Sequence, residues 1–259
     1  MRDGYSAFTR EFMSLTGVDL SSYSQSQVLR RLTAFCLKHR IGSLGALLVA
    51  LKEDPDLLAD CLARLTINVS EFYRDRPYWQ ALKAKVLELA GSRLPLRLWS
   101  AGCAGGEEPY SLAFLLFGHL PRSGREILAS DLSLRALAAA EAGVYPPKAV
   151  KNLTPEEIEL FFYPTETDLL KVKNFLRQGI KFFHHNLLLD PYPSDLDVVL
   201  CRNVIIYFNE QAKKQVLAKA VGSLNLGGLL FVGGSEQIMA PGDFGLERED
   251  VYIYRKITA

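Results

Sequence analysis

The first candidate site is a glycine-rich turn between a predicted strand and a predicted helix. Leu98–Ser111 reads LWSAGCAGGEEPYS, with three glycines in the turn and the pair Glu107 and Glu108 directly after it. Small residues let backbone approach a ligand closely, and a helix N-terminus directs N–H groups towards it. Two carboxylates at this point repel a phosphate and favour a cationic ligand. The alternative is a tight turn with an acidic helix start, which the helix dipole also favours.

A further acidic residue follows the next predicted strand. Asp131 comes 25 residues after Gly106, where a carboxylate can accept hydrogen bonds from both ribose hydroxyls of an adenosine ligand. It can also cap the helix that follows, and the two roles are compatible. The glycine spacing does not match the dinucleotide pattern GxGxxG. S-adenosylmethionine carries a sulfonium, an ammonium and an adenosine but no phosphate, so it fits both acidic positions.

Polar residues also follow a later apolar strand. Leu200–Phe208 reads LCRNVIIYF, which places Arg202 and Asn203 at the carboxyl end of that strand. In an open α/β sheet this edge forms the ligand crevice, and a buried Asn there can orient a polar ligand group. The alternative is a capped strand end followed by a core tyrosine, Tyr207.

A last polar cluster lies outside the strand-and-helix pattern. Leu65–Arg74 reads LTINVSEFYR and links a helical segment to the rest of the chain. Ser70 is predicted to cap a helix. By pattern alone, Arg74 is expected on the surface.

Hydrophobic periodicity predicts the elements that position these residues. An all-helical segment covers residues 5–66, and another helix covers 77–89. From residue 96 strands alternate with helices, which indicates a parallel sheet covered on both faces. Residues 145–185 interrupt this alternation and predict a small antiparallel insertion. The predicted strands are 96–100, 127–130, 197–201, 228–232 and 251–254, with helices at 109–120, 132–142 and 211–224; the insertion holds a helix at 154–162 and strands at 169–172 and 180–183.

Composition excludes several other classes. The 259 residues include 30 Lys and Arg against 29 Asp and Glu, a net charge of +1 that gives nucleic-acid binding no support. No apolar stretch is long enough to span a bilayer, and the start resembles no signal peptide. The four cysteines lack CxxC spacing, so we expect buried, reduced thiols in a cytoplasmic protein and no metal site.

Taken together, these motifs resemble the CheR-type chemotaxis receptor methyltransferases. The family pattern is matched in order by Asn68–Arg74, Trp99–Ser111, Ala129–Asp131, Asn186-Leu187, Cys201–Phe208 and Gly227–Glu236. Departures are mild: Ser70 stands where Thr is common, and Cys103-Ala104 lies within the turn. The resemblance implies S-adenosylmethionine-dependent methylation of chemoreceptor glutamates. It implies a class I methyltransferase (Rossmann-like) α/β fold, with a helical N-terminal domain (1–75) and a methyltransferase domain (76–259) that carries a β-subdomain at about 145–185.

The resemblance also assigns roles to individual residues. Asp131 would hold the ribose, Glu108 would face the methionine ammonium, and Arg74 and Tyr207 would lie near the transferring methyl group. Arg74 would orient either the substrate carboxylate or the carboxylate of the cofactor. The residues that would line the cofactor site are Asn68, Ser70, Arg74, Glu108, Asp131, Asn186, Leu187, Arg202 and Asn203.

A receptor-facing surface is predicted from charge. Residues 20–52 contain basic residues and no acid, and Arg30, Arg31 and Lys38 lie on one predicted helix. This face could dock the acidic helices of a membrane chemoreceptor, although an ordinary solvated face is the alternative. We expect a monomer that does not insert into the membrane.

Three other functions leave part of this pattern unexplained. A methyltransferase of small molecules or RNA would share the glycine turn and Asp131 but would not need the Asn68–Arg74 cluster or the insertion. A non-catalytic sensor of S-adenosylmethionine would not need Arg74 and Tyr207. A nicotinamide dehydrogenase is disfavoured by the glutamate pair.

Overall fold

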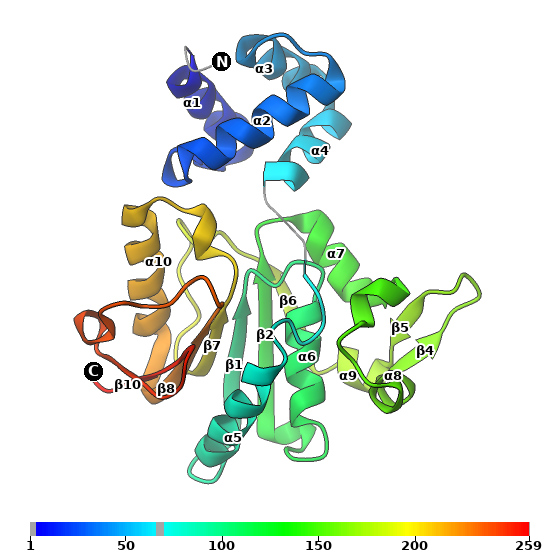
Figure 1. Cartoon of the computed structure of the whole chain (residues 1–259), viewed down its shortest axis with the longest axis vertical. Coiled ribbons are helices and arrows are strands. Elements are labelled where there is room, and N and C mark those ends of the chain that lie inside the picture. The colour runs from blue at the N-terminus through cyan, green and yellow to red at the C-terminus, as the bar shows by residue number, and fades with distance from the viewer. Residues whose placement is uncertain (1–3, 66–69, 259) are drawn as a thin grey trace. The chain divides into compact units, whose positions relative to one another are not determined.

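The computed structural model describes residues 4–65 and 70–258 and divides into two compact units (Figure 1). The first unit consists of Met1–Asn68 and Ile206–Gln215, and the second of Val69–Ile205 and Val216–Ala259. The second unit contains all the strands. The chain therefore combines a helical unit with an α/β unit, as the pattern predicted.

The first unit contains α1 (Tyr5–Thr16), α2 (Gln25–His39), α3 (Leu44–Glu53) and α4 (Pro55–Leu65), together with the segment Ile206–Gln215. These helices confirm that the N-terminal segment is all-helical, as predicted. In α2 the apolar residues Val28, Leu32 and Phe35 recur at helical spacing and are buried. A short 3-10 turn, Leu20–Ser22, joins α1 to α2.

A seven-stranded sheet forms the centre of the second unit, in the order β6-β2-β1-β7-β8-β10-β9. Its neighbouring strands pair in parallel except β10, which is antiparallel to both β8 and β9. This order, with one reversed strand next to the edge, is that of a class I methyltransferase sheet. The bounds are β1 (Leu96–Ala101), β2 (Arg125–Asp131), β6 (Ile180–His184), β7 (Leu196–Cys201), β8 (Leu224–Val232), β9 (Leu246–Arg248) and β10 (Ile253–Lys256).

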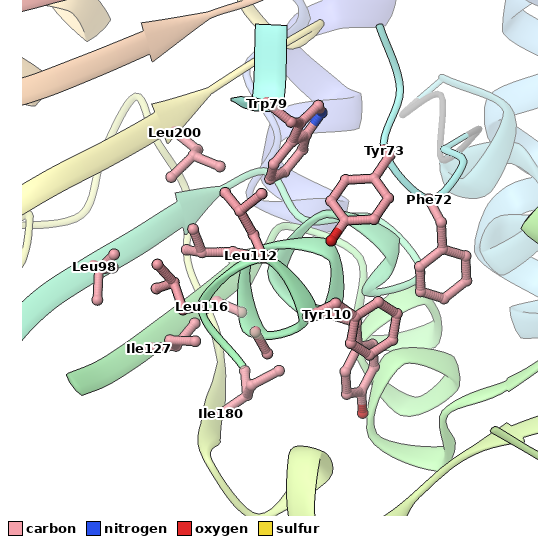
Figure 2. Packing of buried hydrophobic residues seen from close by; sticks show 14 of the residues in the cluster. Phe72, Tyr73, Trp79, Leu98, Tyr110, Leu112, Leu116, Ile127, Ile180 and Leu200 are labelled. Atoms are coloured by element: carbon pink, nitrogen blue, oxygen red, sulfur yellow. The ribbon is translucent and has the colours of Figure 1, made fainter. Parts of the chain in front are cut away.

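Helices connect the strands and cover the sheet. They are α5 (Pro77–Ala90), α6 (Glu107–Leu116), α7 (Leu134–Ala142), α8 (Pro155–Phe161), α9 (Asn174–Arg177) and α10 (Glu210–Ser223); short 3-10 turns cover Arg122–Gly124, Pro147–Val150, Ile205–Tyr207 and Pro241–Phe244. Figure 2 shows the core between α6 and the sheet, where Leu112 and Leu116 of α6 face Leu98, Ile127 and Leu200 of three strands. All of these side chains are buried.

The small sheet of the insertion differs from the prediction. It has the order β3-β5-β4, with β3 (Val144–Tyr145), β4 (Phe162–Pro164) and β5 (Leu170–Val172) paired in antiparallel fashion. The predicted strand 180–183 exists as β6, but its assignment to the insertion was wrong, because β6 pairs in parallel with β2. Short strand patterns do not reveal which sheet a strand joins.

Two local predictions at helix starts are also corrected. Ser70 caps no helix, since residues 72–76 form turns and α5 begins at Pro77. The helix after Asp131 begins at Leu134, because Ser133 is its N-cap and accepts a hydrogen bond from Ala136 N. The start of α8 agrees with prediction: Pro155 follows Thr154, which forms a capping box with Glu157.

No single helix in the described ranges is long and apolar enough to cross a membrane. Helices α2 and α3 would be long and apolar enough only if they are taken together, by length and composition alone, and the chain bends sharply between them.

Candidate active site

The glycine turn after β1 is held in a conformation that needs glycine. Gly102 has a φ of 81°, and a Cβ there would lie 2.5 Å from the side chain of Val204. Gly106 has a φ of 91°, and a Cβ there would lie 2.8 Å from Cβ of Ala140. Both positions combine a left-handed backbone with close packing, so the turn is specified by sequence. It brings the start of α6 to the carboxyl edge of the sheet.

Asp131 at the end of β2 stabilises this turn by hydrogen bonds. One carboxylate oxygen accepts from Ala104 N at 2.9 Å, and the other accepts from Ser133 N at 2.8 Å. Burial raises the pKa of the carboxyl, while these backbone hydrogen bonds oppose the rise. The side chain is therefore fixed between the turn and the start of α7, at the carboxyl end of β2.

Glu108 and Arg202 meet at the same edge, from the start of α6 and the end of β7. Glu108 accepts a hydrogen bond from Ser100 Oγ at 2.7 Å, and its second oxygen lies 3.7 Å from Arg202 Nη1. Burial raises the pKa of Glu108 against the opposing effects of Arg202 and Ser100. Arg202 also donates to Asp75 and to the carbonyl oxygen of Arg74, each at 3.0 Å.

Asn203 is held by a residue whose role we did not predict. Glu236 accepts from the backbone N–H groups of Asn203, Val204 and Gly233 at 2.5, 2.8 and 2.9 Å. Asn203 has a φ of 58°, and its side-chain Oδ1 is buried with no hydrogen-bond partner in the described structure. The signal for Glu236 was present, since it follows two glycines at the end of an apolar strand.

Asn186 and Leu187 follow β6, next to Asp131. His185 N donates to the carbonyl oxygen of Asp131 at 3.1 Å, so the ends of β2 and β6 lie side by side. The Asn186 side chain accepts from Leu188 N at 3.0 Å. Leu187 is buried. The structure thus brings the two predicted residues to the same edge as Asp131.

Arg74 lies in the loop before α5, and its guanidinium has no hydrogen bond or ion pair with a described residue. Its carbonyl oxygen accepts from Trp79 Nε1 at 2.9 Å as well as from Arg202. Ser70 belongs to the same loop and is half-buried. Asn68, also predicted at the cofactor site, lies outside the described residues.

Glu107, the other member of the glutamate pair, is buried like Glu108. One of its carboxylate oxygens is buried without a hydrogen-bond partner in the described structure. Burial raises the pKa of Glu107 to about 7. A nearby residue that we did not predict, Tyr145, donates from its hydroxyl to the carbonyl oxygen of Gly105 at 2.6 Å and so ties the glycine turn to β3.

The remaining predicted residues belong to the first unit. The Arg31 guanidinium lies 4.6 Å from the ring centre of Tyr207 and donates to the carbonyl oxygen of Leu65, and burial lowers its pKa. Lys38 forms an ion pair with Asp60 at 3.2 Å. Of the three predicted docking residues, Arg30 is exposed without such a contact. Arg31 thus contributes to packing within its own unit.

The residues at the sheet edge fit S-adenosylmethionine. This edge of the sheet offers buried carboxylates in place of phosphate-binding groups, which suits a cationic ligand. The unpartnered Oδ1 of Asn203 can accept from an ammonium, and the unpaired guanidinium of Arg74 can bind a carboxylate. Among residues 4–65 and 70–258, no group of His, Cys, Asp and Glu side chains is arranged to hold a metal ion. Fold and site together define a class I S-adenosylmethionine-dependent methyltransferase.

Comparison with known proteins identifies the family. The model for "CheR methyltransferase, SAM binding domain" matches residues 68–253, and that for "CheR methyltransferase, all-alpha domain" matches residues 3–66. The chemotaxis protein methyltransferase of Listeria monocytogenes is 39% identical over 254 residues, with 97% of each chain covered. Chemotaxis protein methyltransferase 1 of Pseudomonas aeruginosa is 36% identical over 244 residues, with 88% of each chain covered.

The chain therefore belongs to the CheR family of chemotaxis protein methyltransferases, as its motifs predicted. It is an S-adenosylmethionine-dependent protein-glutamate O-methyltransferase.

We predict that Asp131→Ala weakens S-adenosylmethionine binding at least about tenfold, because a charge-assisted hydrogen bond contributes roughly 1.5–3 kcal/mol. Isothermal titration calorimetry measures the affinity. Ser133→Ala is the matched control, since it loosens the start of α7 but leaves the carboxylate in place. Unchanged affinity in Asp131→Ala would remove the residue from the cofactor site.

The ionisation of Glu107 predicts a pH-dependent stability. The folded chain keeps this proton up to pH about 7, whereas an unfolded chain loses it near the ordinary value of 4.5. The stabilisation is therefore complete below pH 4.5 and is lost as the pH rises through 7. The free energy of unfolding of Glu107→Gln, minus that of the wild type, should therefore rise by about 2 kcal/mol from pH 5 to pH 8.

Urea denaturation without cofactor measures this change. Glu156→Gln, at an exposed position of α8, is the control and should show little of it. Equal differences between Glu107→Gln and the wild type at both pH values would mean that Glu107 is already ionised in the fold.

Proposed function

We propose that this methyltransferase acts on glutamates of acidic chemoreceptor helices, with Arg74 and Tyr207 next to the reacting groups. The observation that carries the proposal is the unpaired guanidinium of Arg74. The backbone carbonyl oxygen of the same residue is fixed by the buried Arg202 at the carboxyl edge of the sheet. A cation in this position, without a partner in the described structure, is suited to bind a carboxylate.

The proposed reaction requires few catalytic groups from the protein. Bound S-adenosylmethionine supplies an activated methyl group for in-line displacement. A glutamate carboxylate has a reference pKa near ~4.3, so at neutral pH it is already a nucleophile. No general base is needed, and the protein contributes positioning and partial desolvation of two opposite charges.

The cofactor is proposed to be held by residues of the sheet edge. Glu108 and the amide oxygen of Asn203 would accept from its ammonium, and Asp131 would accept from its ribose hydroxyls. Asn186 and Leu187, at the end of β6 beside Asp131, would contact the nucleoside. This arrangement agrees with the burial of Glu108, Asp131 and Leu187 and with the unsatisfied oxygen of Asn203.

Arg74 would orient a carboxylate, either of the receptor glutamate or of the cofactor. A strong ion pair with the nucleophile would lower its reactivity, so contact with the receptor glutamate would have to be transient. Tyr207 would contribute to the geometry around the methyl group. In the first unit its ring is held by Arg31, and its backbone carbonyl oxygen accepts from Ser24 N at 2.8 Å.

The receptor is proposed to dock through basic residues of α2. Arg30 is the predicted docking residue that remains exposed and outside any ion pair with a described residue. Lys38 is exposed but already interacts with Asp60. Arg31 is half-buried and already contacts the ring of Tyr207 and the carbonyl oxygen of Leu65. We therefore place Arg30 at the centre of the proposed docking surface, with Arg31 and Lys38 on the same helix.

We predict that Arg74→Ala and Tyr207→Phe each lower turnover on the order of 10²-fold, as expected when one polar contact is lost in a transition state. Mass spectrometry of a chemoreceptor cytoplasmic fragment after incubation with S-adenosylmethionine measures the γ-methyl esters formed. The exposed residues His119 and His184 are controls, and their replacement by Ala should leave turnover within a few-fold of wild type.

Activity should fall on the acid side as the substrate glutamate is protonated, and the profile should be the same in the two histidine variants as in the wild type. A hundredfold loss in either histidine variant, with folding and cofactor binding intact, would contradict the base-free reaction. Absence of methyl esters on glutamate with the wild-type enzyme would contradict the proposed substrate.

A charge reversal tests the docking surface. Arg30→Glu should lower methylation of the receptor fragment at low ionic strength while cofactor affinity stays unchanged, because the docking attraction is electrostatic. Arg10→Glu, at an exposed position of α1, is the matched control. Equal methylation rates for the two variants in low salt would show that α2 is only a solvated face.

A further inference from the structure

The loop that carries Arg74 is held by the insertion. Phe72 N donates to the carbonyl oxygen of Ala149 at 3.4 Å, and Asn152 Nδ2 donates to the carbonyl oxygen of Phe72 at 3.0 Å. Lys151 forms an ion pair with Glu71 at 2.6 Å. Three contacts thus join the loop to the segment that leads into α8.

The strongest of the contacts between the loop and the insertion is a bidentate ion pair. Arg76 donates from Nη1 and Nη2 to the two carboxylate oxygens of Glu157, at 2.9 and 2.8 Å, and also to the carbonyl oxygen of Asn152. Its guanidinium lies 4.9 Å from the ring centre of Tyr73. The hydrogen bond to Glu157 raises the pKa of Arg76. Glu157 is itself fixed by the capping box with Thr154, so both partners have a defined geometry.

The backbone on both sides of Arg74 needs external support. Tyr73 has a φ of 46° and Asp75 a φ of 59°, which are left-handed conformations that residues other than glycine adopt at a cost. Such a conformation persists only where surrounding contacts impose it. On one side of the loop, Arg202 and Trp79 fix the carbonyl oxygen of Arg74. On the other side, Ser111 of α6 accepts from Tyr73 N at 2.9 Å, and the remaining contacts come from the insertion.

We propose that Arg76 and Glu157 are a positioning pair, through which the insertion sets the backbone conformation that presents the Arg74 guanidinium. The proposal rests on the function proposed above for Arg74. The pair touches neither reacting group and acts only through the loop. The insertion therefore has a part in the methyl-transfer step itself.

Glu157→Gln tests the pair in the full-length chain. Glutamine can still take part in a capping box, so the substitution chiefly removes the charge that faces Arg76. We expect kcat/KM for receptor methylation to fall about tenfold, since small misplacements of a catalytic group lower rates strongly. Glu156→Gln is the matched control, because it makes the same change one residue away at an exposed side chain, whereas Arg76 pairs with Glu157. Its rate should stay within about twofold of wild type.

The decisive measurement repeats Glu157→Gln in an Arg74→Ala background. If the pair acts through Arg74, the second substitution should cause no further loss of kcat/KM. Arg76→Lys keeps the charge but cannot form the bidentate ion pair, so it should lower kcat/KM as Glu157→Gln does. Thermal unfolding establishes that each variant is folded, and Arg76→Lys takes the place of Glu157→Gln if the latter is not.

Wild-type kcat/KM in the folded variants, or an equal further loss in the Arg74→Ala background, would overturn the positioning role. Failure of the proposed function looks different, because Arg74→Ala would then retain full activity by itself.

Discussion

The rest of the site depends on the interactions of one buried charge, the guanidinium of Arg202. Its side chain is 2% exposed and lies between Glu108 at the start of α6 and Asp75 in the loop before α5. The guanidinium also lies over the rings of Trp79 and Phe231, at 5.5 and 4.5 Å. A charge removed from water in this way is tolerated only with well-placed partners. One residue at the end of β7 thereby joins a helix, a loop and the hydrophobic core at a fixed spacing.

Sequence alone predicted the parts of the fold that depend on regular repetition. Alternating apolar strands and helices indicated the parallel sheet, and α2 followed from Val28, Leu32 and Phe35 at helical spacing. The site was predictable for a related reason, because the carboxyl ends of parallel strands meet at one edge. Asp131 and Asn203, which are distant in the sequence, are thus brought to the same edge without any direct signal that connects them.

The parts that were not predicted depend on which partner a residue finds in three dimensions. Ile180–His184 forms a strand as expected, but only the register with β2 shows that it belongs to the main sheet. Arg31 has the sequence context of a surface residue, yet its guanidinium packs on Tyr207, which is about two thirds of the chain away in sequence. Glu236 carried an adequate local signal, but its three backbone partners come from two separate segments. Contacts over such separations leave no periodic trace in one sequence.

The burial of all four thiols has a practical consequence. Cys36, Cys61, Cys103 and Cys201 are free and buried, and burial raises the pKa of each thiol, that of Cys61 to about 12. Alkylating reagents and oxidants attack the thiolate, which these side chains form in negligible amounts while they remain folded. The rate at which a thiol reagent labels the chain therefore reports how often each unit opens. Cys36 and Cys61 report on the helical unit and Cys103 and Cys201 on the α/β unit, so the two local opening equilibria can be followed separately in one sample.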